Sequence, residues 1–133
     1  TIYRCLRHLK VQRMEWQGTD ESEEVIDALC RTAGLSQCRR YDGADTNQLP
    51  QCVLIGGPIA DREAVFNARA GLLAQGCFLI IPDIHDTPMH ALLWQWICTQ
   101  PSVNLSLDLW YVGLVFYRPD FKERQHFVLK HWA

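Results

Sequence analysis

Residues 2–14 alternate between apolar and polar side chains, with Tyr3 and Cys5 on one side of an extended chain and Arg4 and His8 on the other. A period of two residues is typical of a β-strand that buries one face. The pattern therefore predicts a first strand over residues 2–14 with one solvent-exposed face.

A helix is predicted next, over residues 20–34. Asp20 and Glu23 have the spacing of a capping box, apolar residues then recur every three or four positions, and Gly34 provides a stop. Residues 36–41 predict a short strand, and residues 42–47, which are rich in Asp, Gly and Asn, predict an exposed turn.

The middle of the chain predicts a β-α-β unit. Residues 53–55 and 77–81 are apolar without a break, as expected of central strands that are covered on both faces. Between them, residues 61–75 carry apolar side chains at helical spacing until Gly76. The two strands should be parallel and joined by a right-handed crossover.

The last third of the chain predicts one helix and two strands. Thr87 and Pro88 open the helix, because proline is tolerated in a first turn, and the helix stops before Pro101. Residues 107–117 and 125–132 predict a C-terminal hairpin joined around residues 118–120. The elements together predict one α/β domain over residues 1–133, a three-layer sandwich with a central mixed sheet and the order β-α-β-β-α-β-α-β-β.

Composition agrees with a single domain, because 133 residues are enough to bury one core. The net charge is −2, and no apolar run reaches the roughly 18 residues of a membrane span. Most of the six cysteines lie in apolar segments and none forms a Cys-x-x-Cys pair, which favours free thiols in a reducing cytoplasm over disulfides or a zinc site. We therefore expect a cytoplasmic protein with no cofactor and no membrane association.

Two glycines lie where the first buried strand gives way to a helix. In open α/β sheets, ligands collect outside the carboxyl ends of the strands, beside helix N-termini. Gly56 and Gly57 would let a ligand approach the backbone there, whereas Asp61 and Glu63 would repel a phosphate. The pattern favours a neutral, nucleoside-like ligand. The alternative is a tight turn with a purely structural role.

The same stretch resembles the first β-α-β unit of the nucleoside 2-deoxyribosyltransferase-like proteins. Over residues 53–83 it has an apolar strand, the turn Gly56, Gly57 and Pro58, a helix carrying Asn67, and a second strand that ends in proline. The resemblance implies a flavodoxin-like sheet that binds a nucleoside or nucleotide through these four residues. No glutamate matches the nucleophile of those transferases, so the resemblance implies a binding site and leaves open whether the protein is an enzyme.

Carboxylates and an imidazole follow the second buried strand. Asp83, His85 and Asp86 are predicted as catalytic residues, because such groups can transfer protons at the carboxyl end of a strand. Their spacing matches no established metal motif, and no metal is predicted. The alternative is that Asp83 or Asp86 caps the next helix and that His85 is an exposed loop residue.

Two functions follow from these patterns. The first is a small cytoplasmic protein that binds a nucleoside or nucleotide at Gly56 and Gly57. The alternative is a non-catalytic interaction or dimerisation module, as in accessory or mobile-element proteins, that uses the C-terminal hairpin. The absence of Lys and Arg over residues 70–117 favours this alternative. Basic and aromatic residues also mix near the C-terminus, but the net charge of −2 does not favour nucleic acid as a partner.

Overall fold

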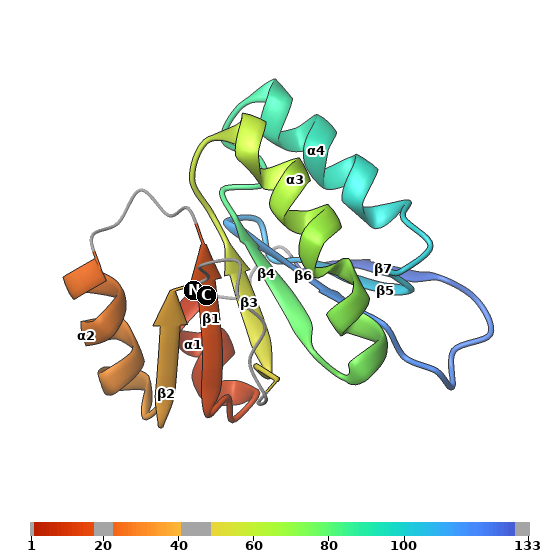
Figure 1. Ribbon diagram of the computed structural model, residues 1–133. Coiled ribbons are helices and arrows are strands. Elements are labelled where there is room, and N and C mark those ends of the chain that lie inside the picture. The colour runs from red at the N-terminus through yellow and green to blue at the C-terminus, as the bar shows by residue number, and fades with distance from the viewer. Residues whose placement is uncertain (1, 18–22, 41–48, 130–133) are drawn as a thin grey trace.

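The computed structural model describes residues 2–17, 23–40 and 49–129, and its elements surround one seven-stranded mixed sheet (Figure 1). The strands are β1 (Arg13–Gln17), β2 (Gln37–Arg40), β3 (Cys52–Ile55), β4 (Phe78–Pro82), β5 (Leu105–Asp108), β6 (Val112–Phe116) and β7 (Gln125–Val128). Within the described residues the helices are α1 (Ile2–His8), α2 (Glu23–Ala33), α3 (Ile59–Arg69), the 3-10 helix η1 (Ala70–Gln75) and α4 (Pro88–Cys98). None of these helices is long and apolar enough to cross a membrane.

The strand order is β2-β1-β3-β4-β6-β5-β7. The first four strands in this order are parallel, β6 is antiparallel to both β4 and β5, and β7 is parallel to β5. The chain moves outward from β1 to β2, returns past β1 to β3, and continues in the opposite direction to β4. The direction of winding therefore reverses between β1 and β3.

Helices cover both faces of the sheet because every second residue of a strand points to the same face. Cys52 and Leu54 of β3 pack in one hydrophobic cluster with residues of α1 and α2, including Leu6 and Ile26. Val53 and Ile55 pack in a second cluster with α3 and α4, through Phe66, Trp94 and Ile97. Figure 1 shows α3 and α4 side by side on one side of the sheet, away from α1 and α2.

Several predicted elements are confirmed. The strand at residues 53–55 is central, with all four residues of β3 buried between β1 and β4. The last helix begins at Pro88, and the Thr87 hydroxyl accepts a hydrogen bond from the His90 N–H at 3.2 Å. The middle helix starts at Ile59, two residues before the predicted position, and its final turns are the 3-10 helix η1. Asp20 and the turn over residues 42–47 lie outside the described residues.

The predicted strand over residues 2–14 is wrong. The chain begins with α1, and β1 starts only at Arg13. Cys5 and Leu6 are adjacent and both buried, which an alternating strand cannot achieve, whereas a helix places both toward the sheet. Lys10 then takes a left-handed φ of 54° in the turn that leads to β1. The element order therefore begins α-β instead of β-α.

The predicted C-terminal hairpin is also wrong. Residues 107–117 are not one strand, because the chain turns at residues 109–111 and forms an antiparallel hairpin of β5 and β6. Strand β7 pairs with β5 in parallel register and lies at the edge of the sheet. Ser106 Oγ and His126 Nδ1, 2.6 Å apart, link these two strands. Residues 130–132 of the predicted strand lie outside the described residues.

A buried charge joins the other edge of the sheet to α3. Glu15 of β1 is 1% exposed, and its carboxylate lies 3.1 Å from the Arg39 guanidinium of β2 and 2.7 Å from that of Arg69. A carboxylate this deeply buried is stable only when cations neutralise it. The three side chains thus fix the position of α3 relative to β1 and β2.

Candidate functional site

A cleft of about 480 Å³ lies at the carboxyl ends of β3 and β4, between the sheet and the first two helices. Its apolar wall comes from α1, α2 and the sheet, and its polar wall comes from the loops that follow the strands. The lining residues are Ile2, Tyr3, Val25, Ile26, Leu29, Leu54, Gly56, Gly57, Arg62, Pro82, Asp83, Tyr111 and Val112. A volume of this size is typical of sites for small organic ligands.

The floor of the cleft is the glycine turn after β3. Gly56 and Gly57 are both buried, and the Gly56 N–H donates to the Gln17 carbonyl at 2.9 Å, which joins the ends of β3 and β1. Gly57 has a φ of 80°, in the left-handed region that glycine adopts without steric strain. The turn therefore requires glycine at position 57 for its backbone geometry, whether or not a ligand is bound.

An arginine that sequence reasoning did not select holds this turn. Arg62, in the first turn of α3, is only 3% exposed. Its Nε donates to the Gly57 carbonyl at 2.9 Å, and its Nη1 donates to the Pro82 carbonyl at 2.6 Å. Arg62 thus connects the carboxyl ends of β3 and β4 and places a positive charge in the wall of the cleft. Its position four residues after Pro58, in the first turn of the helix, was the available signal.

The opposite side of the cleft is formed where β4 meets β6. The Asp83 N–H donates to the Tyr111 carbonyl at 2.7 Å. Asp83 itself has a left-handed φ of 59°, a conformation that aspartate tolerates better than most residues. Its side chain is exposed, and the Tyr111 side chain is 67% exposed. The cleft is therefore bordered by an accessible carboxylate and an accessible aromatic ring.

A smaller hollow of about 180 Å³ adjoins the cleft and contains all three predicted catalytic residues. Asp83, His85 and Asp86 line it together with Trp110 and Tyr111. Asp83 and Tyr111 line both spaces, so a ligand in the cleft would reach the hollow along these two residues. The structure thus brings together the carboxylates and the imidazole that the sequence placed at this loop.

His85 is held in one orientation by Asp108. The imidazole Nε2 lies 2.7 Å from Asp108 Oδ2, and the ring stacks on Trp110 with centroids 4.6 Å apart. The other carboxylate oxygen of Asp108 accepts the Trp110 N–H at 2.9 Å, although Trp110 has a φ of 73° that is unusual for a bulky residue. Asp108 was not predicted from the sequence, because it lies 23 residues after His85 and reaches it only through the pairing of the strands.

This contact determines what His85 can do chemically. A carboxylate can only accept a hydrogen bond, so a neutral His85 carries its proton on Nε2 and leaves Nδ1 as an acceptor. The pair resembles the arrangement of a general base and its orienting acid. The His85 side chain is 28% exposed, whereas that of Asp108 is 7% exposed, so the imidazole is the accessible partner.

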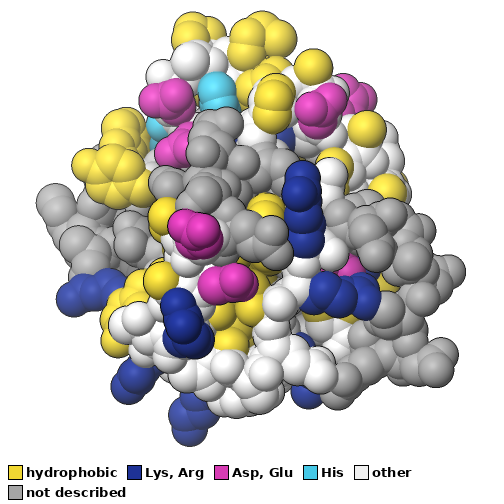
Figure 2. Space-filling view, turned by 60° about the vertical axis from the view of Figure 1, so that its left-hand side comes forward, with side chains coloured by type: hydrophobic (Ala, Val, Ile, Leu, Met, Phe, Trp, Pro, Cys, Tyr) yellow, Lys and Arg dark blue, Asp and Glu magenta, His cyan; other side chains and the backbone are white. Residues whose placement is uncertain are grey.

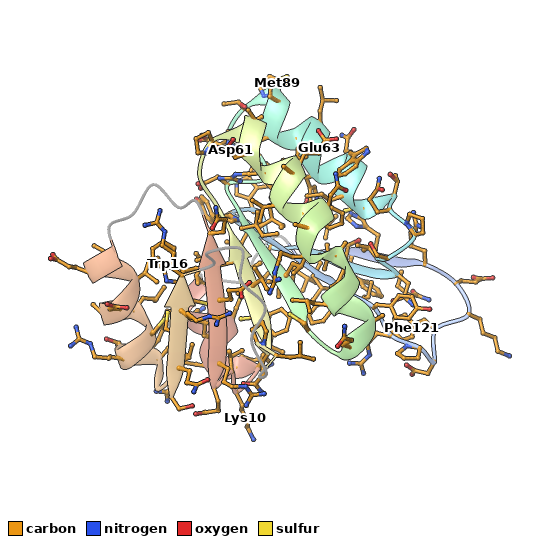
Figure 3. All side chains as sticks on the ribbon, in the orientation of Figure 1. Lys10, Trp16, Asp61, Glu63, Met89 and Phe121 are labelled. Carbon is orange, nitrogen blue, oxygen red and sulfur yellow. The ribbon has the colours of Figure 1, made fainter. Side chains whose placement is uncertain are left out.

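The remaining predicted residues lie around the edge of the site. Pro58 is exposed and precedes α3, and the Pro58 carbonyl accepts the Asp61 N–H at 3.0 Å. Asn67 is exposed on α3 and does not line the cleft. In Figure 3, Asp61 lies at the start of α3 and Lys10 at the opposite end of the molecule. Figure 2 shows hydrophobic side chains gathered at the upper end of one face, near a histidine and acidic side chains.

No group of three or more His, Cys, Asp or Glu residues that could hold a metal occurs in the described part of the chain. Another hollow, of about 460 Å³, lies near the amino ends of β1 and β2 and is lined by Arg13, Gln37 and Leu49 among others. There Arg13 Nε already donates to the Leu49 carbonyl at 3.2 Å. The carboxyl-end cleft is the better candidate, because ligands in open α/β sheets bind at that end.

Comparison of the chain with protein-family models, curated proteins and solved structures gives no match. The cleft and the adjoining hollow are therefore the features of this protein that indicate a function.

Proposed function

We propose that the cleft binds a nucleoside, or the nucleoside part of a nucleotide. The observation that carries this proposal is the combination of a glycine-floored cleft with an aromatic ring and a carboxylate at its opening. Tyr3 and Tyr111 offer rings on which a base can stack. Asp83 can accept hydrogen bonds from ribose hydroxyls, as acidic residues do in dinucleotide-binding folds.

The charge of the cleft favours a nucleoside over a polyphosphate. The Arg62 guanidinium donates to two main-chain carbonyls, so it contributes more to holding the turn than to binding phosphate. Asp83 lines the cleft and Asp61 lies in the first turn of α3, and both carboxylates would repel a phosphate at the helix start. These residues can therefore recognise the base and the sugar of a nucleoside, but not a polyphosphate.

The strand order supports the proposal that the fold is Rossmann-like. The parallel strands follow the order 2-1-3-4, which is the order of the first four strands in flavodoxin-like sheets. The next position, which holds a fifth parallel strand in those sheets, is occupied by the antiparallel strand β6. In our proposal β6 and the turn before it supply Val112 and Tyr111 to the cleft in place of a further β-α unit.

His85 and Asp108 extend the proposal to proton transfer. A nucleoside whose sugar contacts Asp83 would place polar atoms in the hollow beside His85, and the unprotonated Nδ1 could accept a proton there. Among the described residues that line the cleft, Asp83 is the one carboxylate. A reaction at the glycosidic bond, of the kind that the transferases this chain resembles carry out, would depend on Asp83 and His85 in this protein.

Thermal shift against a panel of nucleosides and 5′-monophosphates tests the proposal. A ligand at a hundredfold its dissociation constant stabilises the folded state by roughly 2.7 kcal/mol, which raises the melting temperature by several degrees. Tyr111→Ala and Asp83→Asn should abolish the shift. The matched controls Tyr117→Ala and Asp61→Asn, exposed residues outside the cleft, should retain it. A flat panel would count against the proposal.

A second candidate function is association through the edge of the sheet. All four residues of β7 are exposed, and Phe127, Val128 and Leu129 are 47%, 50% and 40% exposed. In the described part of the chain β7 pairs on one side alone, and such edges can accept a further strand. This observation supports a homodimer or another protein partner. Size-exclusion chromatography with light scattering tests it, and a monomer at high concentration would argue against a homodimer.

A further inference from the structure

Two of the six cysteines are in direct contact. Cys30 lies on α2 and Cys38 on β2, and their sulfur atoms are 2.6 Å apart. A disulfide bond is about 2.05 Å long, so the two sulfur atoms already lie close to bonding distance with no atom between them. Each of the other four thiols is without such a partner in the described residues: Cys5, Cys52 and Cys77 are buried, and Cys98 is half-buried.

The Cys30–Cys38 pair borders a groove on the protein surface. A groove of about 370 Å³ between α2 and β2 is lined by Cys30 and Cys38 together with Glu24, Asp27 and Arg31. Cys38 is only partly buried, whereas Cys30 is 3% exposed. A small oxidant that enters the groove can therefore reach the pair, of which Cys38 is the more exposed member.

We propose that Cys30 and Cys38 form a reversible redox site that hydrogen peroxide converts into a disulfide. The site is separate from the nucleoside cleft, and it stands whether or not that cleft binds a nucleoside. The two carboxylates of Glu24 and Asp27 outnumber the one cation, Arg31, among the groove's lining residues, and this excess of negative charge favours neutral hydrogen peroxide over anionic glutathione disulfide.

The contact also changes the pKa values of the two thiols. The hydrogen bond between the two thiols lowers the pKa of Cys30 and raises the pKa of Cys38. The thiolate is the form that attacks an oxidant, so Cys30 is the first residue to react and Cys38 is the resolving thiol. By contrast, burial raises the pKa of Cys98, the half-buried thiol without a sulfur neighbour.

The reaction has two balanced steps. The Cys30 thiolate attacks one oxygen of hydrogen peroxide, the O–O bond breaks, and the products are a Cys30 sulfenic acid and hydroxide. The Cys38 thiol then attacks the sulfenic sulfur, the S–S bond forms, and the sulfenic oxygen leaves as water after taking a proton. In total, two thiols and one hydrogen peroxide give one disulfide and two waters, and a small thiol such as dithiothreitol reverses the change.

Thiol counting after exposure to stoichiometric hydrogen peroxide tests the proposal. The unfolded, reduced chain should show six reactive thiols and the oxidised chain four, because the bridge removes two. Trypsin cleaves after Arg31 and Arg39, so residues 14–31 and 32–39 should appear as one linked peptide, about 2 Da lighter than the sum of the two. The bridge should also raise the melting temperature by roughly 5–10 °C, because it restricts the unfolded chain.

Variants separate this pair from general oxidation. Cys30→Ser and Cys38→Ser should prevent the bridge, and the matched control Cys98→Ser should still form it. Six intact thiols, a sulfinic acid at Cys30 in place of the linked peptide, or a bridge that involves Cys98 would each overturn the proposal. A bridge that forms with glutathione disulfide and not with hydrogen peroxide would overturn the assignment of the oxidant. Thiol counting and peptide mapping of the oxidised wild-type protein test the proposal even if a variant fails to fold.

Discussion

Strands β3 and β7 have the same length, yet all four residues of β3 are buried and all four of β7 are exposed. The difference extends to the two halves of the sheet. The parallel half, β2-β1-β3-β4, has helices on both faces and contains the buried side chain Glu15, and Arg62 of α3 is buried against its strand ends. The antiparallel half, β6-β5-β7, ends in an exposed edge and carries Trp110 and Tyr111, which are 54% and 67% exposed.

The comparison shows how the candidate site arises. The parallel half supplies rigid backbone in the form of the glycine turn and the end of β4. The antiparallel half supplies accessible side chains, because its β5–β6 turn projects Trp110 and Tyr111 beside Asp83 and His85. The hollow lies where the two halves meet, beside the end of β4 and the turn before β6, and the cleft extends from there past the end of β3. The following predictions test this division of roles, from the largest expected effect to the smallest.

Arg62→Met should give the largest loss of stability in the parallel half. The substitution leaves the Gly57 and Pro82 carbonyls without their donor, and hydrogen bonds to a charged group contribute about 1.5–3 kcal/mol each. We expect urea denaturation to show a loss of about 3 kcal/mol. Arg31→Met, at an exposed position of α2, is the control and should change stability by less than about 0.5 kcal/mol. Equal effects would mean that Arg62 does not hold the turn.

Gly113→Ala tests whether the antiparallel half is as closely packed as the parallel half. A Cβ at position 113 would lie 2.3 Å from the ring of Trp94, so β6 or α4 would have to move. Overpacking of this kind costs typically 1–3 kcal/mol. Gly71→Ala is the matched control, because nothing lies within 4 Å of its added Cβ. Comparable melting temperatures for the two variants would show that α4 packs loosely on β6.

Alkaline pH should weaken the core through its thiols. Burial raises the pKa of Cys5 to about 11 and of Cys77 to about 12, from an ordinary value of 9.0. Above pH 9 the unfolded thiols ionise while the folded ones keep their protons. The folded state then binds more protons, and the free energy of unfolding decreases as pH rises from 9 toward 11.

Each thiol can contribute up to about 1.4 kcal/mol per pH unit in that window, and nothing below it. Urea denaturation at pH 8, 9 and 10 measures the slope. Cys77→Ala should reduce the slope by the share of one thiol. A free energy of unfolding that does not change between pH 8 and 10 would show that these thiols are not protected from solvent.

Phe127→Glu should have the smallest effect on stability, under about 0.5 kcal/mol, because β7 is exposed. If β7 joins two copies of the chain, the same variant should convert a dimer into a monomer in light scattering. A loss of several kcal/mol would instead place Phe127 in the core and would remove the contrast between β3 and β7.

The fold was predictable where the sequence pattern had one interpretation. Uninterrupted apolar runs identified β3 and β4, and Thr87 with Pro88 identified the start of α4. The first helix was missed because residues 2–14 fit both an alternating strand and a helix, and a helix of seven residues, about two turns, gives little periodicity. The β5–β6 turn was missed because it has no glycine or proline; Trp110 adopts its left-handed φ with the help of the Asp108 hydrogen bond.

The candidate site was also predictable only in part. Gly56, Gly57 and Asp83 follow their strands directly, and the rule that ligands bind at carboxyl ends was enough to select them. Arg62 and Asp108 were missed because their roles depend on contacts between segments that lie 20 and 23 residues apart. Tyr111 was missed because the turn that exposes it was read as the middle of a strand.

The most direct test of the central claim is a nucleoside titration followed by amide chemical shifts in ¹H–¹⁵N NMR spectra. If the cleft binds a nucleoside, the amides of Gly56, Gly57, Asp83 and Tyr111 should shift in a saturable way, and those of the distant β7 should not. Saturation at these four residues would confirm the site at the junction of the two halves. No shifts with any nucleoside, or saturable shifts confined to β7, would contradict it.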